Sequence, residues 1–124
     1  MKKKILVIDD DELLTKTFSR LLVKQNYEVL WATRPEDALL IVKERDCDLI
    51  LCDIRMPGKN GVETIREVQG IFGEYGKNCP PVIFLTGFAD PQLEREARAL
   101  NPFAYVFKPF DTQELLELIS AGLE

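Results

Sequence analysis

Four of the chain's apolar segments are followed by side chains that could form a metal site: Asp9 and Asp10 after the first, Asp53 after the third, Thr86 after the fourth and Lys108 after the fifth. If these segments are parallel strands, residues that follow them collect at one edge of the sheet. The carboxylates there repel one another unless a cation neutralises them. Carboxylate oxygens suit Mg²⁺, so the pattern predicts a magnesium site with a hydroxyl and an ammonium group beside it.

Each of these residues also has an ordinary structural explanation. Asp10 or Asp11 can cap a helix, Asp53 can simply end a strand, and Lys108 can be a surface lysine. Taken together, however, acids at the ends of adjacent strands are hard to explain without a cation. The joint placement therefore favours the metal-site interpretation.

The elements that must position these side chains alternate regularly along the chain. Continuous apolar runs predict strands at 5–8, 27–32, 49–52, 81–85 and 103–107. Between and after them, apolar residues recur at helical spacing, as in Leu14, Phe18 and Leu22. Five repeats of strand and helix predict an α/β fold with one five-stranded parallel sheet, right-handed crossovers and helices on both faces.

Capping residues predict where several helices begin. Pro35 suits the first position of the second helix, and Asp90 with Pro91 opens the fourth, which should contain Leu93, Ala97 and Leu100. Two pairs with the spacing of a cap precede the third and fifth helices: Asn60 with Glu63, and Asp111 with Glu114. The glycine-rich stretch 70–81 is expected to be a mobile surface segment.

Composition narrows the class of protein. The 124 residues, 46% hydrophobic and 30% charged, predict one globular domain over 1–124. The net charge of −5 argues against direct binding of nucleic acid, and the lack of a long apolar run against a membrane span; a cytoplasmic location is expected. The absence of histidine excludes histidine-based nucleophile pairs and metal sites. Three cysteines are too few for a disulfide framework and are expected to be buried or idle thiols.

Several sequence fragments, in order and at compatible spacing, resemble one family. They are ILVIDD at 5–10, DIRMPG at 53–58 with Gly61, Thr86-Gly87, and YVFKPF at 105–110. The whole chain resembles the receiver domain of bacterial two-component response regulators. The resemblance implies a flavodoxin-like (βα)5 fold with strand order 2-1-3-4-5.

The resemblance also implies an acid site with assigned roles. Asp53 is expected to be the phosphoacceptor, and Mg²⁺ is expected to be bound by Asp10, Asp53 and the backbone carbonyl of Arg55. Asp9 is expected to reach the metal through water. The phosphoryl donor is expected to be a sensor histidine kinase or a phosphotransfer protein. The domain would then be a signalling switch rather than an enzyme, because it catalyses only its own phosphorylation and dephosphorylation.

Further residues are expected to respond to the phosphoryl group. Lys108 and the Thr86 hydroxyl would bind its oxygens, and Tyr105 would turn inward as Thr86 moves, changing the surface of the fourth helix, fifth strand and fifth helix. An ordinary aromatic residue at a strand edge is the alternative for Tyr105. Lys108-Pro109 should be a cis peptide, and Arg55 and Phe88 should slow loss of the phosphoryl group by hindering water.

Part of the chain departs from the family pattern. Asn101-Pro102-Phe103-Ala104 replaces a segment that is commonly Gly-Ala followed by acidic residues. Asn101 can still adopt the left-handed conformation of a glycine. The change makes the expected partner surface less charged.

Three other functions compete with this interpretation. An aspartate phosphatase of the haloacid dehalogenase type needs a second acid two residues after its nucleophile, where this chain has Arg55. A flavin mononucleotide carrier needs a phosphate-binding loop after the first strand, where this chain has three aspartates. A receiver that serves only as a docking module would lack the acceptor or the lysine, and both are present.

Overall fold

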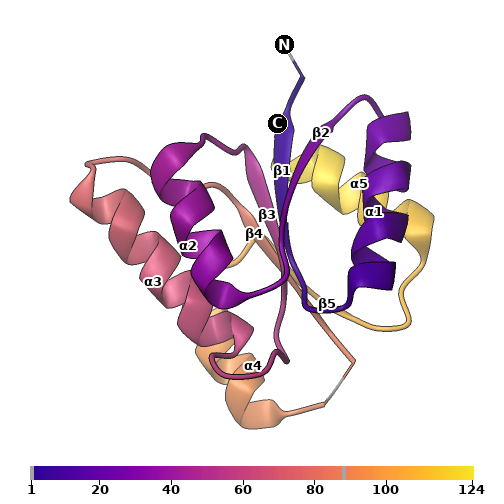
Figure 1. The fold of residues 1–124 in the computed structure, drawn as a ribbon. Coiled ribbons are helices and arrows are strands. Elements are labelled where there is room, and N and C mark those ends of the chain that lie inside the picture. The colour runs from indigo at the N-terminus through magenta and orange to yellow at the C-terminus, as the bar shows by residue number, and fades with distance from the viewer. Residues whose placement is uncertain (1, 88) are drawn as a thin grey trace.

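The computed structural model describes residues 2–87 and 89–124. These residues form five strands and five helices that alternate along the chain (Figure 1): β1 (Lys4–Ile8), α1 (Glu12–Lys24), β2 (Glu28–Ala32), α2 (Pro35–Glu44), β3 (Leu49–Asp53), α3 (Gly61–Glu74), β4 (Val82–Thr86), α4 (Pro91–Arg98), β5 (Ala104–Phe107) and α5 (Thr112–Gly122). The alternation predicted from apolar runs and helical spacing is confirmed.

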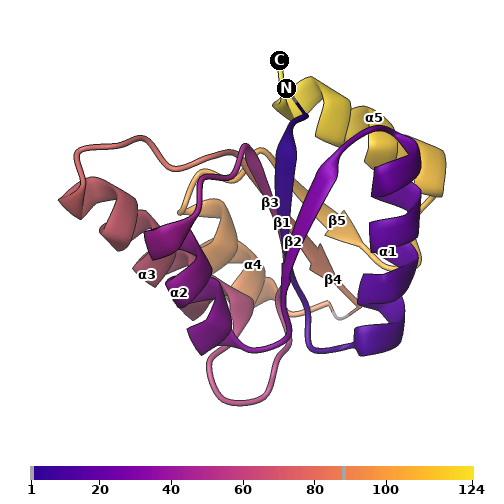
Figure 2. The same cartoon turned by 45° about the horizontal axis from the view of Figure 1, so that its top comes forward.

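The five strands form one parallel sheet in the order β2-β1-β3-β4-β5. Helices α1 and α5 cover one face, and α2, α3 and α4 cover the other (Figures 1 and 2). This is the flavodoxin-like arrangement that the resemblance implied. The strand order places β1 and β3 side by side in the middle of the sheet, so that the residues that follow them are neighbours.

Apolar side chains on both faces explain why the central strands are continuous apolar runs. Along β1, Ile5 and Val7 pack under α1 and α5, whereas Leu6 and Ile8 pack under α2 and α3. Strands β3 and β4 are buried in the same way at every position. A strand that lies between two helical layers needs apolar residues on both sides, which removes the polar alternation of a half-exposed strand.

The caps that the sequence predicted begin three of the helices. Asn60 and Glu63 form a reciprocal capping box at α3, with bonds of 2.9 and 3.0 Å between side chain and backbone. Asp90 and Asp111 accept bonds from the backbone of the third residue of α4 and α5. Because each carboxylate satisfies an N–H group that has no partner within its helix, these residues fix where the helices start.

Some predicted boundaries are wrong. Helix α3 continues to Glu74, so only the part of 70–81 after that residue is a connection. Helix α4 ends at Arg98, which leaves Leu100 beyond it, and Asn101 then takes a left-handed conformation with φ of 56°. The second, fourth and fifth strands each begin one residue later than predicted. In the described part of the chain, none of the helices has the length and apolar character needed to span a membrane.

Candidate functional site

The residues singled out by the sequence do meet at one edge of the sheet. Asp9 follows β1, Asp53 and Thr86 are the last residues of β3 and β4, and Lys108 follows β5. Parallel pairing aligns the carboxyl ends of the strands: Asp53 lies opposite Leu85, the residue before Thr86. A backbone hydrogen bond continues the contact between these strands past the end of β5: the Lys108 N–H donates to the Thr86 carbonyl at 2.7 Å.

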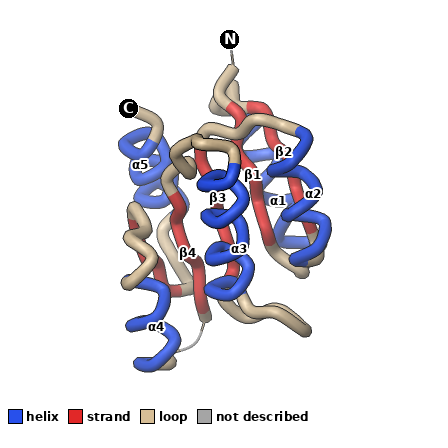
Figure 3. Tube along the Cα trace, turned by 90° about the vertical axis from the view of Figure 1, so that its left-hand side faces the viewer, coloured by secondary structure: helices blue, strands red, loops and turns tan. Residues whose placement is uncertain are grey.

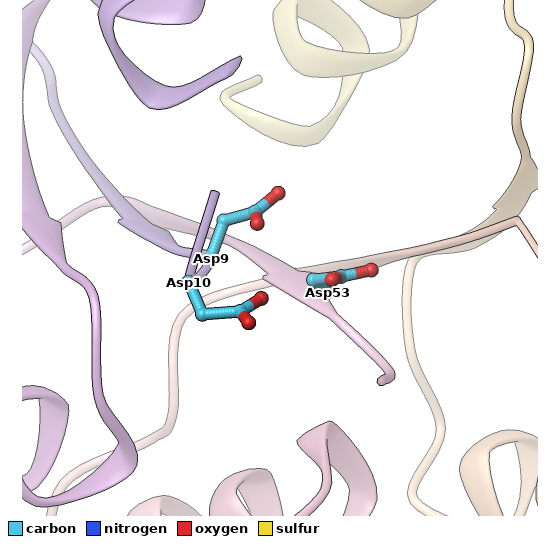
Figure 4. A group of neighbouring side chains, drawn as sticks. All are labelled: Asp9, Asp10 and Asp53. Carbon is cyan, nitrogen blue, oxygen red and sulfur yellow. The ribbon is translucent and has the colours of Figure 1, made fainter. Parts of the chain in front are cut away.

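Three carboxylates form a compact acidic cluster at this edge, made of Asp9, Asp10 and Asp53 (Figure 4). One carboxylate oxygen from each lies within 4.8 Å of the other two. Asp9 and Asp53 are buried, with 1% and 7% of their surface exposed, whereas Asp10 is exposed and points toward Asp53. The acidic cluster is therefore accessible to solvent at Asp10 and buried at Asp9 and Asp53.

The neighbouring Asp11 has a different role. Its side chain caps α1 by accepting a bond from the Leu14 N–H at 3.1 Å, and its own N–H donates to Asp9 Oδ1 at 2.9 Å. The structural explanation offered for the aspartate run is thus correct for Asp11. The same residue holds the Asp9 carboxylate in place.

The other carboxylate oxygen of Asp9, Oδ2, is in a position that favours a metal ion at this site. Among the described residues, Asp9 Oδ2 is the buried side-chain atom that has no hydrogen-bond partner. Burying a carboxylate oxygen without a partner is costly, and a cation beside it would remove that cost. With Asp10 and Asp53 nearby, the oxygens present are those that Mg²⁺ prefers, so the acidic cluster could hold a metal ion.

Lys108 supplies positive charge next to the acidic cluster. Its ammonium nitrogen lies 3.4 Å from Asp53 Oδ1 and 3.8 Å from Asp9 Oδ2. The Lys108–Pro109 peptide bond is cis, as predicted. One lysine cannot balance three carboxylates, so the site keeps a net negative charge.

Burial and mutual repulsion change the protonation of the two buried acids. Burial, followed by the charge of Asp9, raises the pKa of Asp53 to about 6, although Lys108 opposes the shift. Burial also raises the pKa of Asp9, against the bond from the Asp11 N–H and the charge of Lys108. Both carboxylates are therefore poised to gain from a cation that stabilises their ionised form.

The connection from β3 to α3 is held tightly against Asp53. The Gly61 N–H donates to the Ile54 carbonyl at 2.7 Å, and a Cβ atom at Gly61 would overlap the carbonyl oxygen of Asp53. The Cys52 thiol contacts the carbonyl oxygens of Asp53 and Gly61 at 3.4 and 3.9 Å. The sequence motif contained Gly61 but did not reveal that this residue packs directly against the Asp53 backbone. The feature that could have indicated it is an isolated glycine at the start of a capped helix.

Arg55 lies within this connection, and its carbonyl as a metal ligand stays a prediction. The expectation that Arg55 and Phe88 shield the site also stays a prediction in the case of Arg55. Phe88 lies outside the described residues.

Tyr105 belongs to a group of aromatic rings on the neighbouring strands β4 and β5. Its ring is 5.3 Å from that of Phe107 and 6.3 Å from that of Phe84, measured between centroids. The guanidinium of Arg98 lies 5.2 Å from the Tyr105 ring centroid and bonds to Glu94 at 2.8 Å. The cation–π contact was not predicted, because it depends on how α4 packs beside β5.

Comparison with known proteins agrees with this geometry. A family model, "Response regulator receiver domain", matches residues 5–120. The chain belongs to that family. Receiver domains are signalling domains with a phosphoacceptor role, and they imply phosphodonors such as histidine kinases as partners.

Solved structures of other receivers are closely similar. A CheY-like receiver domain protein from Methanospirillum hungatei JF-1 is 26% identical, with a TM-score of 0.90 over 99% of this chain and 94% of that one. The chemotaxis protein CheY4 of Vibrio cholerae is 27% identical, with a TM-score of 0.87 over 99% and 100% of the two chains. The N-terminal domain of a response regulator/sensory box/GGDEF protein from Carboxydothermus hydrogenoformans is 32% identical, with a TM-score of 0.84 over 98% and 94%.

Proposed function

We propose that residues 1–124 act as one receiver unit that accepts a phosphoryl group on Asp53 from a histidine kinase or a phosphotransfer protein. The observation that carries the proposal is the position of the Asp53 carboxylate. It lies at the end of a central strand, beside the acidic cluster's other members and 3.4 Å from the Lys108 ammonium group. A nucleophilic carboxylate next to a metal-binding acid pair and a fixed cation suits transfer of a phosphoryl group.

In the transfer step, one Asp53 carboxylate oxygen attacks the phosphorus of the donor. A new O–P bond forms, and the bond between phosphorus and the donor's histidine nitrogen breaks. The electron pair of that bond stays on the imidazole ring. The product is an acyl phosphate on Asp53 and an unphosphorylated donor.

Asp10, Asp53 and the Arg55 carbonyl would hold Mg²⁺, with Asp9 reaching it through water. When bound there, Mg²⁺ would neutralise the carboxylates and the phosphoryl oxygens that approach them. The buried Asp9 oxygen without a hydrogen-bond partner supports this assignment. In this arrangement Asp11 keeps Asp9 correctly oriented through its backbone N–H.

Lys108 and Thr86 would bind the phosphoryl group once it is on Asp53. Lys108 already faces Asp53 and can transfer its charge–charge contact to a phosphoryl oxygen. Thr86 is buried at the end of β4 and would donate its hydroxyl. Thr86 ends β4 and Lys108 directly follows the neighbouring strand β5, whose last residue, Phe107, pairs with Thr86 in the sheet.

The proposed response is a change in the surface formed by α4, β5 and α5. Tyr105 lies on β5 beside α4, with its ring partly buried against Phe84. Movement of Thr86 toward the phosphoryl group would let the Tyr105 ring turn inward, which alters the face presented to a partner.

Incubation with Mg²⁺ and acetyl phosphate tests the acceptor. The protein should gain one phosphoryl group that is stable to acid and labile to base, measured by intact mass, with the modified peptide containing Asp53. The Asp53→Asn variant should gain none, since an amide lacks a nucleophilic oxygen anion. EDTA in excess over the metal should also abolish the modification.

Asp46→Asn is the matched control, because Asp46 precedes β3 at the opposite end of the sheet and its side chain is 91% exposed. This variant should be phosphorylated as the parent is. Modification that persists in Asp53→Asn, or that proceeds equally in EDTA, contradicts the proposal.

A further inference from the structure

Two of the three cysteines lie at the end of the sheet opposite to the acidic cluster. Cys47 precedes β3 and Cys79 precedes β4, and these strands are parallel neighbours. The register pairs Ile50 with Val82, and each cysteine stands three residues before its strand's partner in that pair. The Ile50 N–H donates to the Pro81 carbonyl at 2.9 Å, which extends the contact between the two segments to a residue two positions after Cys79. The connections that carry them reach the same end of the sheet (Figure 3).

The surroundings of the two thiols are also shared. Cys47 and Cys79 are both half-buried and both pack against the apolar core under α2 and α3. They are close enough to influence one another: after burial, the charge of Cys79 is the largest cause that raises the pKa of Cys47, to about 12. Burial raises the pKa of Cys79 to about 11. Cys52, by contrast, is fully buried at the other end of β3.

We propose that Cys47 and Cys79 form a reversible disulfide that ties the start of β3 to the start of β4. Both cysteines lie just before strands that are parallel neighbours. Chains paired in a sheet are about 4.8 Å apart, and a disulfide spans a Cα separation of about 4.4–6.8 Å. Both cysteine side chains pack against the same apolar cluster, so the bond would form at the edge of that cluster. The bond would enclose β3 and α3 in one covalent loop.

An oxidant of the disulfide class, such as oxidised glutathione, can close this bond. A thiolate of one cysteine attacks the glutathione disulfide, which releases one glutathione and leaves a mixed disulfide. The second cysteine then displaces the other glutathione. Two S–H bonds are lost and one S–S bond forms, and the two electrons and two protons leave as two molecules of glutathione.

The protonation of the thiols sets the speed of the reaction. Both cysteines are almost entirely protonated at neutral pH, and the thiolate is the attacking form. The bond should therefore form slowly near pH 7 and roughly ten times faster for each pH unit up to about 9.

The test oxidises the reduced protein with oxidised glutathione at about pH 8.5, unfolds it, and alkylates the remaining thiols. Before alkylation, the expected product is a monomer that is lighter than the reduced protein by the mass of two hydrogens. After alkylation, Cys52 alone should carry the label. A digest should contain one cross-linked pair of peptides, with Cys47 in one and Cys79 in the other. Its melting temperature should rise by roughly 10 °C and return to the starting value with dithiothreitol. Phosphorylation of Asp53 should be unchanged, because the bond lies at the far end of β3.

Cys47→Ser and Cys79→Ser are paired controls, and each should abolish the cross-link and the thermal shift. Alkylation of both Cys47 and Cys79 after oxidation overturns the proposal. So does a stable mixed disulfide with glutathione on either residue, or a disulfide that joins two chains. These results bear on the thiols alone and leave the proposed function of Asp53 untouched.

Discussion

Gly61→Ala is expected to lower the free energy of unfolding by about 3 kcal/mol, which is roughly 10 °C in melting temperature. The added methyl group would overlap the carbonyl oxygen of Asp53 and meet the Cα of Ile54 at 3.0 Å. Both are backbone atoms, which cannot move aside by changing a rotamer. The start of α3 must shift instead, and the bond from the Gly61 N–H to the Ile54 carbonyl lengthens or breaks.

The same displacement of the start of α3 should also slow phosphorylation, even at a temperature where the variant remains folded. The connection between Asp53 and Gly61 carries Arg55, whose carbonyl is a proposed metal ligand. A displacement of about 1 Å can cost two orders of magnitude in rate. We expect the rate of labelling by acetyl phosphate to fall at least tenfold at a temperature where the variant is fully folded by circular dichroism.

Gly70→Ala is the matched control on the same helix. A Cβ atom there would meet no atom of the described residues within 4 Å, and Gly70 is exposed in the interior of α3. This variant should be more stable than the parent by about 0.5–1 kcal/mol, because alanine loses less backbone entropy than glycine in a helix. If Gly61→Ala melts within about 1 °C of the parent, the close packing of Gly61 against the Asp53 backbone is contradicted.

The position of the sheet between two helical layers could be predicted from the residues themselves, whereas the strand order followed from the resemblance to receiver domains. Buried strands such as β1 carry apolar residues on both faces, which only a sheet between two helical layers can accommodate. The boundary errors have a local cause. Gly70 and Gly73 weaken the helical signal of α3, but Phe72 is buried in the core, and that packing continues the helix past both glycines.

The sequence predicted which residues lie together at the candidate site, but it did not predict the contacts that they make. The end of each parallel strand places Asp53, Thr86 and Lys108 at one edge whatever the details of packing. Three consecutive aspartates, however, cannot be told apart by spacing, and the structure assigns the cap of α1 to Asp11. The contact between Arg98 and Tyr105 joins separate elements, so no local pattern announces it.

Asp53→Asn is expected to raise the melting temperature in EDTA at about pH 7.5 by roughly 6–10 °C, or about 2 kcal/mol. In the parent, Asp53 is ionised at that pH although burial and the charge of Asp9 raise its pKa to about 6. Keeping it ionised in the fold costs free energy that the unfolded chain does not bear. An amide of similar size removes the charge and with it the cost.

The dependence on pH follows from the direction of the shift. An exposed aspartate has a pKa of 3.8, so between about pH 4 and 6 the folded parent binds a proton at Asp53 that the unfolded chain has released. This contribution to stability is complete below about pH 4 and is lost as the pH rises through about 6. The amide that replaces the carboxylate in the variant stays neutral throughout. The gap between variant and parent should therefore be widest above about pH 7 and should close as the pH falls toward about 4.

Mg²⁺ should stabilise the parent more than Asp53→Asn and so narrow the difference between their melting temperatures. At a free concentration about ten times its Kd, a ligand that binds only the folded state adds roughly 1.4 kcal/mol, or roughly 3–6 °C, to the parent. The variant should gain less, because one carboxylate ligand has become an amide. The Asp46→Asn control, with its exposed side chain at the opposite end of the sheet, should follow the parent in every condition.

Thermal melts of the three proteins from about pH 4.5 to 8, in EDTA and in Mg²⁺ at matched ionic strength, distinguish repulsion within the acidic cluster from a set of unrelated caps. A favourable capping carboxylate would make Asp53→Asn the less stable protein in EDTA, with a deficit that grows as the pH rises. Mg²⁺ would then shift all three proteins alike. Repulsion within the acidic cluster requires the opposite sign in EDTA and a metal response that depends on Asp53, and no adjustment of the other charges produces both.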